Sequence, residues 1–148
     1  MDIRNGVAGF LFRRPGETYE VLLLRRATEP FHGEWFPVEG KRALHEQPQE
    51  TMLREIAEET GLVPDRLYWK STEPQLVPSR GYRVRIWVFV GFVQGDAMVR
   101  LNGEHYEYRW LSVPEAVQRL PLPAQRDSLQ RIAAQFLYQM PPQSLRVV

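Results

Sequence analysis

Hydrophobic and polar residues alternate most clearly between Tyr82 and Val93, where β-branched and aromatic side chains predominate. Because successive side chains of a strand point to opposite faces, this segment predicts a strand with one face of valine, isoleucine and phenylalanine. The other face carries Arg83, Arg85, Trp87 and Phe89. The arginines and the tryptophan could contact phosphate and stack on a ring. Alternatively, another layer of the domain covers this face.

Comparable patterns predict the remaining elements. Strands are expected at residues 3–12, 19–24, 34–38, 67–77 and 106–111, with an irregularity at Pro74 in the fourth of these. Helices are expected at residues 48–61, 112–120 and 124–138. In the first helix, Pro48 suits the first turn and Gly61 suits a left-handed cap at the end. Strands and helices in mixed order predict an α/β domain with helices packed on a mixed sheet.

Length and composition narrow the class of protein. A chain of 148 residues is expected to form one domain, over residues 1–140, with residues 141–148 as a frayed tail. The formal net charge of +1 gives no global reason to expect a nucleic-acid or membrane partner. The chain has no apolar run of about 20 residues, which a membrane helix requires. It also has no cysteine and no signal-peptide pattern, so a cytoplasmic location is expected.

The candidate functional residues lie on the first predicted helix. Glu55, Glu58 and Glu59 share one stripe, because positions i, i+3 and i+4 lie on the same helical face. Carboxylates at this spacing repel one another. A hard divalent cation would offset that repulsion, since Mg²⁺ takes oxygen ligands and binds through carboxylates and substrate phosphates. For an arbitrary group of glutamates, a solvated acidic face is the alternative.

The residues around these glutamates have a specific spacing. Gly40 is followed by five residues and Glu46, and then by seven residues and the run REIAEETGL, which begins at Arg54. This segment resembles the Nudix box at every fixed position and without a gap. The resemblance implies a Nudix-type α/β/α sandwich with a mixed β-sheet. It also implies an enzyme that hydrolyses a nucleoside diphosphate linked to another moiety.

The same resemblance implies roles for single residues. The expected metal ligands are three carboxylates and one backbone carbonyl, those of Glu55, Glu58, Glu59 and Gly40. The metal is expected to be Mg²⁺, with Mn²⁺ as a substitute, which would shield the phosphates and activate a water. Arg54 is expected to hold the catalytic glutamates in place, and Glu46 to fix the geometry between loop and helix.

A further acid is expected from a separate segment. Residues 101–111 contain a Glu-His pair before a Tyr-x-Trp-Leu strand. They resemble the corresponding segment of Nudix nucleoside triphosphate pyrophosphatases and diadenosine tetraphosphate hydrolases. Glu104 is therefore expected to serve as general base or as an additional metal ligand. Arg25 and Arg26 end a predicted strand where resembling pyrophosphatases carry basic residues, so one of them is expected to contact phosphate unless both are simply solvated.

The leading hypothesis is a Mg²⁺-dependent pyrophosphohydrolase that acts on a nucleoside triphosphate or a related pterin triphosphate. The loop from Trp35 to Gly40 reads Trp-x-x-Val-x-Gly. It resembles the dihydroneopterin triphosphate and deoxyadenosine triphosphate pyrophosphatase group. A dinucleoside polyphosphate hydrolase is the second enzyme hypothesis. A Nudix-fold regulator that binds a nucleotide without cleaving it would be expected to lose box carboxylates, and all are present. Many relatives form dimers, so both a monomer and a homodimer are kept as alternatives.

Overall fold

Two long parallel strands form the centre of the molecule. In the computed structural model, which describes residues 2–79 and 81–148, β1 (Asp2–Arg13) pairs with β7 (Tyr82–Phe92) from Asp2 opposite Tyr82 to Phe12 opposite Phe92. Glycine 9 lies on β1 where a side chain would not fit, because its Cβ would be 2.9 Å from the Met52 sulfur of α1 (Pro48–Thr60). The first helix therefore packs directly on the centre of the sheet.

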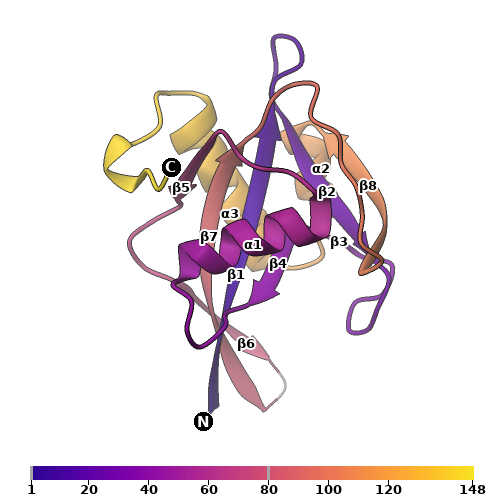
Figure 1. Cartoon of the computed structure of the whole chain (residues 1–148), viewed down its shortest axis with the longest axis vertical. Coiled ribbons are helices and arrows are strands. Elements are labelled where there is room, and N and C mark those ends of the chain that lie inside the picture. The colour runs from indigo at the N-terminus through magenta and orange to yellow at the C-terminus, as the bar shows by residue number, and fades with distance from the viewer. Residues whose placement is uncertain (1, 80) are drawn as a thin grey trace.

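Shorter strands pair with the outer edges of β1 and β7. Along β1, β4 (Val38–Lys41) pairs with the middle, from Gly6 to Gly9, and β2 (Glu20–Arg26) with the last residues. Along β7, β6 (Gln75–Ser79) pairs with the first half and β5 (Arg66–Trp69) with the second. β2 also carries β3 (Trp35–Phe36) and β8 (His105–Leu111). The mixed sheet therefore divides into two wings that diverge from β1 and β7 (Figure 1).

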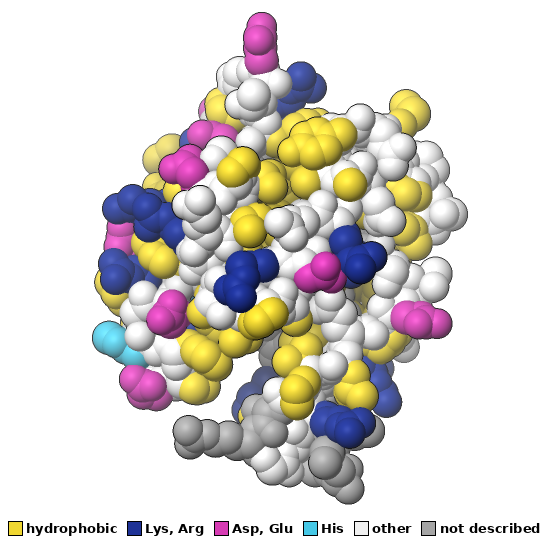
Figure 2. Space-filling view, turned by 180° about the vertical axis from the view of Figure 1, so that it is seen from behind, with side chains coloured by type: hydrophobic (Ala, Val, Ile, Leu, Met, Phe, Trp, Pro, Cys, Tyr) yellow, Lys and Arg dark blue, Asp and Glu magenta, His cyan; other side chains and the backbone are white. Residues whose placement is uncertain are grey.

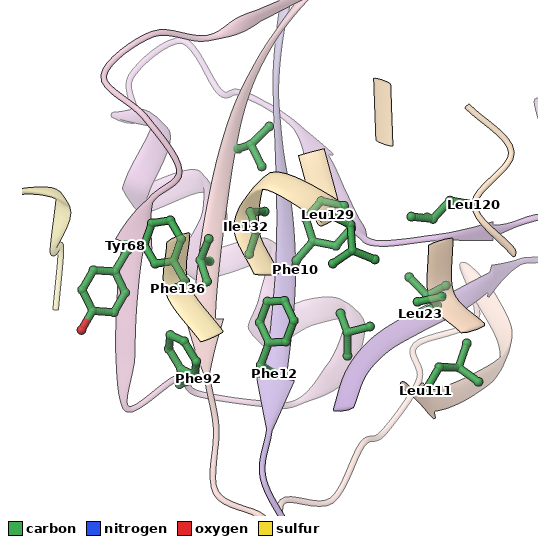
Figure 3. Close-up of a cluster of buried hydrophobic side chains, with 14 of the residues drawn as sticks. Phe10, Phe12, Leu23, Tyr68, Phe92, Leu111, Leu120, Leu129, Ile132 and Phe136 are labelled. Carbon is green, nitrogen blue, oxygen red and sulfur yellow. The ribbon is translucent and has the colours of Figure 1, made fainter. Parts of the chain in front are cut away.

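Helices cover both faces of the sheet. On one face α1 lies against β1 and β4. The other face is covered by α3 (Pro123–Ile132) and its π-helical continuation η1 (Ala133–Leu137), with α2 (Val113–Arg119) beside β2. Figure 3 shows Phe10 and Phe12 of β1 directed at Leu129, Ile132 and Phe136. This arrangement confirms the expected α/β fold with helices packed on a mixed sheet.

Two segments differ from the sequence expectation. The strand expected at residues 67–77 is two strands, because Ser71 accepts a hydrogen bond from the Glu73 N–H in a turn and Pro74 has no N–H to offer a neighbouring strand. The tail expected to be frayed is instead held against β5. The Val147 N–H donates to the Leu67 carbonyl at 2.6 Å, which satisfies a backbone group that an edge strand would leave open.

Candidate active site

The helix that carries the box glutamates has well-defined ends. At its start the Gln47 N–H donates to the Glu50 carboxylate at 2.8 Å, and Pro48 occupies the first turn. At its end Gly61 adopts φ 72°, and its N–H donates to the Ala57 carbonyl. Both ends therefore lie where the sequence placed them, and they set the rotation of the glutamates about the helix axis.

Arg54 joins the loop before α1 to the glutamates on it. Its Nε and Nη2 atoms donate to the two carboxylate oxygens of Glu46, at 2.9 and 3.0 Å. Its Nη1 atom donates to Glu55 at 3.0 Å and to Glu58 at 3.2 Å. The hydrogen bonds from Arg54, with a further one from Thr51, lower the pKa of Glu46 to about 2. Loop and helix are thereby fixed relative to each other.

We expect the Glu46→Gln variant to have a lower melting temperature than the native chain at pH 7. The folded-state pKa of Glu46 is depressed, so the stabilisation from this carboxylate is complete above its ordinary pKa of 4.5 and is lost as the pH falls towards about 2. Thermal unfolding between pH 7 and pH 3 should show the two melting temperatures converging. Glu17→Gln, in an exposed turn, is the control. A difference that is constant with pH would contradict this account.

Three carboxylates converge beside this network. One oxygen each of Glu55, Glu59 and Glu104 lie within 4.8 Å of one another. Glu104 comes from the loop before β8, where its carbonyl accepts a hydrogen bond from the Ala27 N–H at 2.9 Å and its carboxylate accepts one from the Asn102 amide at 3.1 Å. The structure therefore brings together acids from two segments that are distant in sequence.

Glu59 is the buried member of this cluster, with 2% of its surface exposed. Burial, followed by the neighbouring carboxylates of Glu55 and Glu104, raises its pKa to about 10. One Glu59 oxygen and the His105 Nδ1 atom, 3.8 Å apart, are buried without hydrogen-bond partners among the described residues. Burial also lowers the pKa of His105. A bound cation would offset the charge of the ionised Glu59 carboxylate.

Gly40 supports the cluster by having no side chain. A Cβ atom at this position would lie 2.3 Å from the carboxyl carbon of Glu55. Glu55 therefore lies directly against the end of β4. This close approach explains in physical terms why a glycine stands at the first position of the box.

A cleft of about 520 Å³ opens beside the cluster, between β4, the first residues of β1 and those of β7. It is visible as a hollow on the face shown in Figure 2, towards the β6–β7 end of the molecule. Arg26 and Glu39 line it, together with Tyr82, Val84 and Ile86 of β7. Burial raises the pKa of Glu39 to about 7, against the opposing effect of Arg26.

The structure places the predicted substrate residues in different environments. Arg26 lines the cleft and donates to the Pro30 carbonyl at 2.9 Å. Arg25 donates to the Gly33 carbonyl at 2.8 Å and to Glu107 at 3.2 Å, and it is not among the residues that line the cleft. Arg83, Arg85 and Trp87 lie on the alternate face of β7, where Trp87 packs edge-to-face on Trp69 at 5.4 Å. Glu39 and Tyr82 were not predicted. The alternation within β7 could have placed Tyr82 with Val84, but nothing in it indicates which face borders the cleft.

Comparisons with known proteins show the family of the chain. The family model described as NUDIX domain matches residues 2–134, so the chain belongs to the NUDIX family. It is 33% identical over 127 residues to the asymmetrical bis(5'-nucleosyl)-tetraphosphatase of Rattus norvegicus, covering 84% of each protein. The MutT protein from Methanosarcina mazei Go1 has a similar structure, with a TM-score of 0.74, 29% identity and coverage of 90% of this chain and 94% of that one.

A further relative is a longer protein. The chain is 37% identical over 128 residues to an octanoyltransferase of Myxococcus xanthus, a match that includes 80% of this chain and 34% of that protein. The family predicted from the box and the Nudix-type fold are thus confirmed, whereas the resemblance to the dihydroneopterin triphosphate and deoxyadenosine triphosphate group stays a prediction. Within the described ranges, no helix is long and apolar enough to cross a membrane.

Proposed function

We propose that this protein is a divalent-metal-dependent pyrophosphohydrolase that cleaves a nucleoside triphosphate or a related pterin triphosphate and releases pyrophosphate. One observation carries the proposal: oxygens of Glu55, Glu59 and Glu104 lie within 4.8 Å of one another, beside a cleft lined by Arg26. The unpartnered, buried oxygen of Glu59 gives this cluster an unfilled requirement for a cation.

The donors fit a hard divalent ion, because every donor is an oxygen. Glu55, Glu59 and Glu104 would hold it, and Gly40, which lies directly against Glu55, would contribute its carbonyl. Glu58 is the remaining proposed metal ligand. Its side chain is half-exposed and is bound to Arg54. When bound, Mg²⁺ or Mn²⁺ supplies charge neutralisation for the phosphates and lowers the pKa of a bound water.

The protein's own residues then have separate tasks. Arg54 keeps Glu55 in position, since it donates to Glu55 and Glu46 at the same time. Glu104 is the exposed acid of the cluster, so it can accept a proton from an attacking water or act as a further ligand. Arg26 places a guanidinium on the cleft wall, where it can balance the charge of a phosphate.

A dinucleoside polyphosphate hydrolase is the second candidate. The observation in its favour is the similarity to the rat tetraphosphatase, which extends over 84% of both proteins. A nucleotide-binding regulator is the non-enzymatic alternative. The intact set of box carboxylates argues against it, since a protein that only binds the nucleotide has no use for activation of water.

A substrate panel with product identification tests the proposal. Purified protein would be incubated with nucleoside triphosphates, a pterin triphosphate and dinucleoside tetraphosphates, with Mg²⁺ and with EDTA. We expect Mg²⁺-dependent release of pyrophosphate from a triphosphate. Cleavage of dinucleoside tetraphosphates alone would favour the second candidate. No cleavage of any compound in the presence of Mg²⁺ or Mn²⁺ would overturn the proposal.

A further inference from the structure

β8 is the outermost strand of its wing of the sheet, and one of its two edges has no partner strand. Its ladder with β2 runs from Leu111 opposite Val21 to His105 opposite Arg26. Over residues 2–79 and 81–148, no other strand pairs with β8, and Figure 1 shows it at the margin of the molecule. The backbone N–H and C=O groups on this outer edge can therefore accept a further strand.

The features that usually protect an edge strand are sparse on β8. Its sequence, HYEYRWL, contains neither proline nor lysine. A bulge interrupts the ladder with β2 at one end, between Arg25 and Arg26. Tyr106 and Tyr108 are 51% and 41% exposed, so aromatic side chains lie uncovered along the strand. An open edge with exposed aromatic residues favours pairing with a strand of another chain.

The two charged residues of β8 flank Tyr108 and lie on one face of the strand. Hydrogen bonds from Arg25 and Arg109 lower the pKa of Glu107, so its carboxylate is ionised at neutral pH. Arg109 donates to Glu107 through Nε at 3.2 Å, and its Nη1 and Nη2 atoms donate to no group that the structure describes. Both side chains are partly exposed. Each can therefore take a further partner across the open edge.

These charges distinguish between the registers in which two β8 strands can pair. In an antiparallel pair with two-fold symmetry, one residue lies opposite its own copy. With Tyr108 in this position, Glu107 of each copy lies opposite Arg109 of the other. With Glu107 or Arg109 in this position, two identical charges lie opposite each other, which destabilises the pair. Of these three registers, the one centred on Tyr108 is the one that places opposite charges together.

We propose that β8 is the interface of a homodimer, in which the β8 strands of two copies pair antiparallel around Tyr108 and join the two sheets. The partner is a second copy of this chain, because the order Glu-Tyr-Arg is complementary to itself in reverse. Backbone hydrogen bonds along the edge, two ion pairs between Glu107 and Arg109, and contact between the two Tyr108 rings hold the copies together. The inference concerns assembly and does not rest on the proposed hydrolysis.

Sedimentation of charge-reversed variants tests this interface. We expect the native chain to sediment with twice its mass of 17.4 kDa at micromolar concentrations. Arg109→Glu and Glu107→Arg should each sediment as monomers, since each variant places like charges opposite each other. An equimolar mixture of the two variants should form a dimer again, because every glutamate then lies opposite an arginine. Glu73→Arg, in the exposed turn between β5 and β6, is the control and should stay dimeric.

A third variant keeps the test decisive if a charge reversal lowers the melting temperature. Tyr108→Asp leaves the hydrogen bonds of Glu107 in place, and it should be monomeric because two carboxylates would lie opposite each other at the symmetry axis. A native chain that sediments at 17.4 kDa throughout the concentration series would overturn the inference. A dimer that persists in Arg109→Glu or Tyr108→Asp would do the same, and so would folded charge-reversed variants that stay monomeric when mixed.

Discussion

The Glu59→Gln variant should lose more than about 100-fold in kcat for the best substrate of the panel. Substitution of residues that merely orient a metal ligand commonly costs 10- to 100-fold, and Glu59 is proposed to bind the metal itself. The carboxylate is 2% exposed, so no water can readily take its place. Initial rates across a Mg²⁺ titration would measure the effect, and saturating Mg²⁺ should not restore the native rate.

Unfolding experiments separate this loss from misfolding. The folded-state pKa of Glu59 is raised, so its contribution to stability is complete below its ordinary pKa of 4.5 and is lost as the pH rises towards about 10. Without metal, Glu59→Gln should therefore gain melting temperature relative to the native chain over this range. Glu50→Gln, which keeps the capping acceptor at the start of α1, is the control. Native-like kcat in Glu59→Gln would refute the metal assignment.

The second large effect is expected for Gly40→Ala. The added methyl group would overlap the Glu55 carboxyl carbon, which lies 2.3 Å from the position of the new Cβ. Glu55 must move, and a displacement of about 1 Å in a catalytic site can reduce the rate by about 100-fold. We expect a loss of kcat/KM of that order together with weaker Mg²⁺ dependence, measured by initial rates in a metal titration.

Gly16→Ala provides a matched control. It adds the same methyl group in the turn between β1 and β2, where nothing lies within 4 Å of the new atom. Its kcat/KM should equal that of the native chain. If Gly40→Ala also keeps native kcat/KM and metal dependence, then the position of Glu55 does not determine activity. A melting temperature near the native one would show that any loss in Gly40→Ala is local.

The sequence was most informative where the arrangement of side chains depends on local structure alone. The helix period and the caps at Pro48 and Gly61 place Glu55 and Glu59 together without tertiary information. Glu58, predicted on the same stripe, is bound to Arg54 and is not one of the three clustered carboxylates. Glu104 required a resemblance, because only pairing of β8 with β2 brings its loop to the helix. The C-terminal segment required the structure, since its hydrogen bonds are made to β5, which is distant in sequence.

Residues of the cleft were harder to predict for a different reason. The alternation in β7 separates Arg83 and Arg85 from Val84 correctly, but both faces of this strand carry buried side chains in its second half. A pattern of two faces cannot indicate which of them borders an open cavity.

The two faces of β1 have a consequence for how variants should combine. Gly9 on one face contacts Met52 of the helix with the carboxylates, whereas Ala8 on the other face lines a small pocket at the start of α3. Substitutions around Met52 and substitutions around this pocket therefore act on β1 from opposite faces. Free-energy effects of substitutions on the two sides should be nearly additive in a double-mutant cycle.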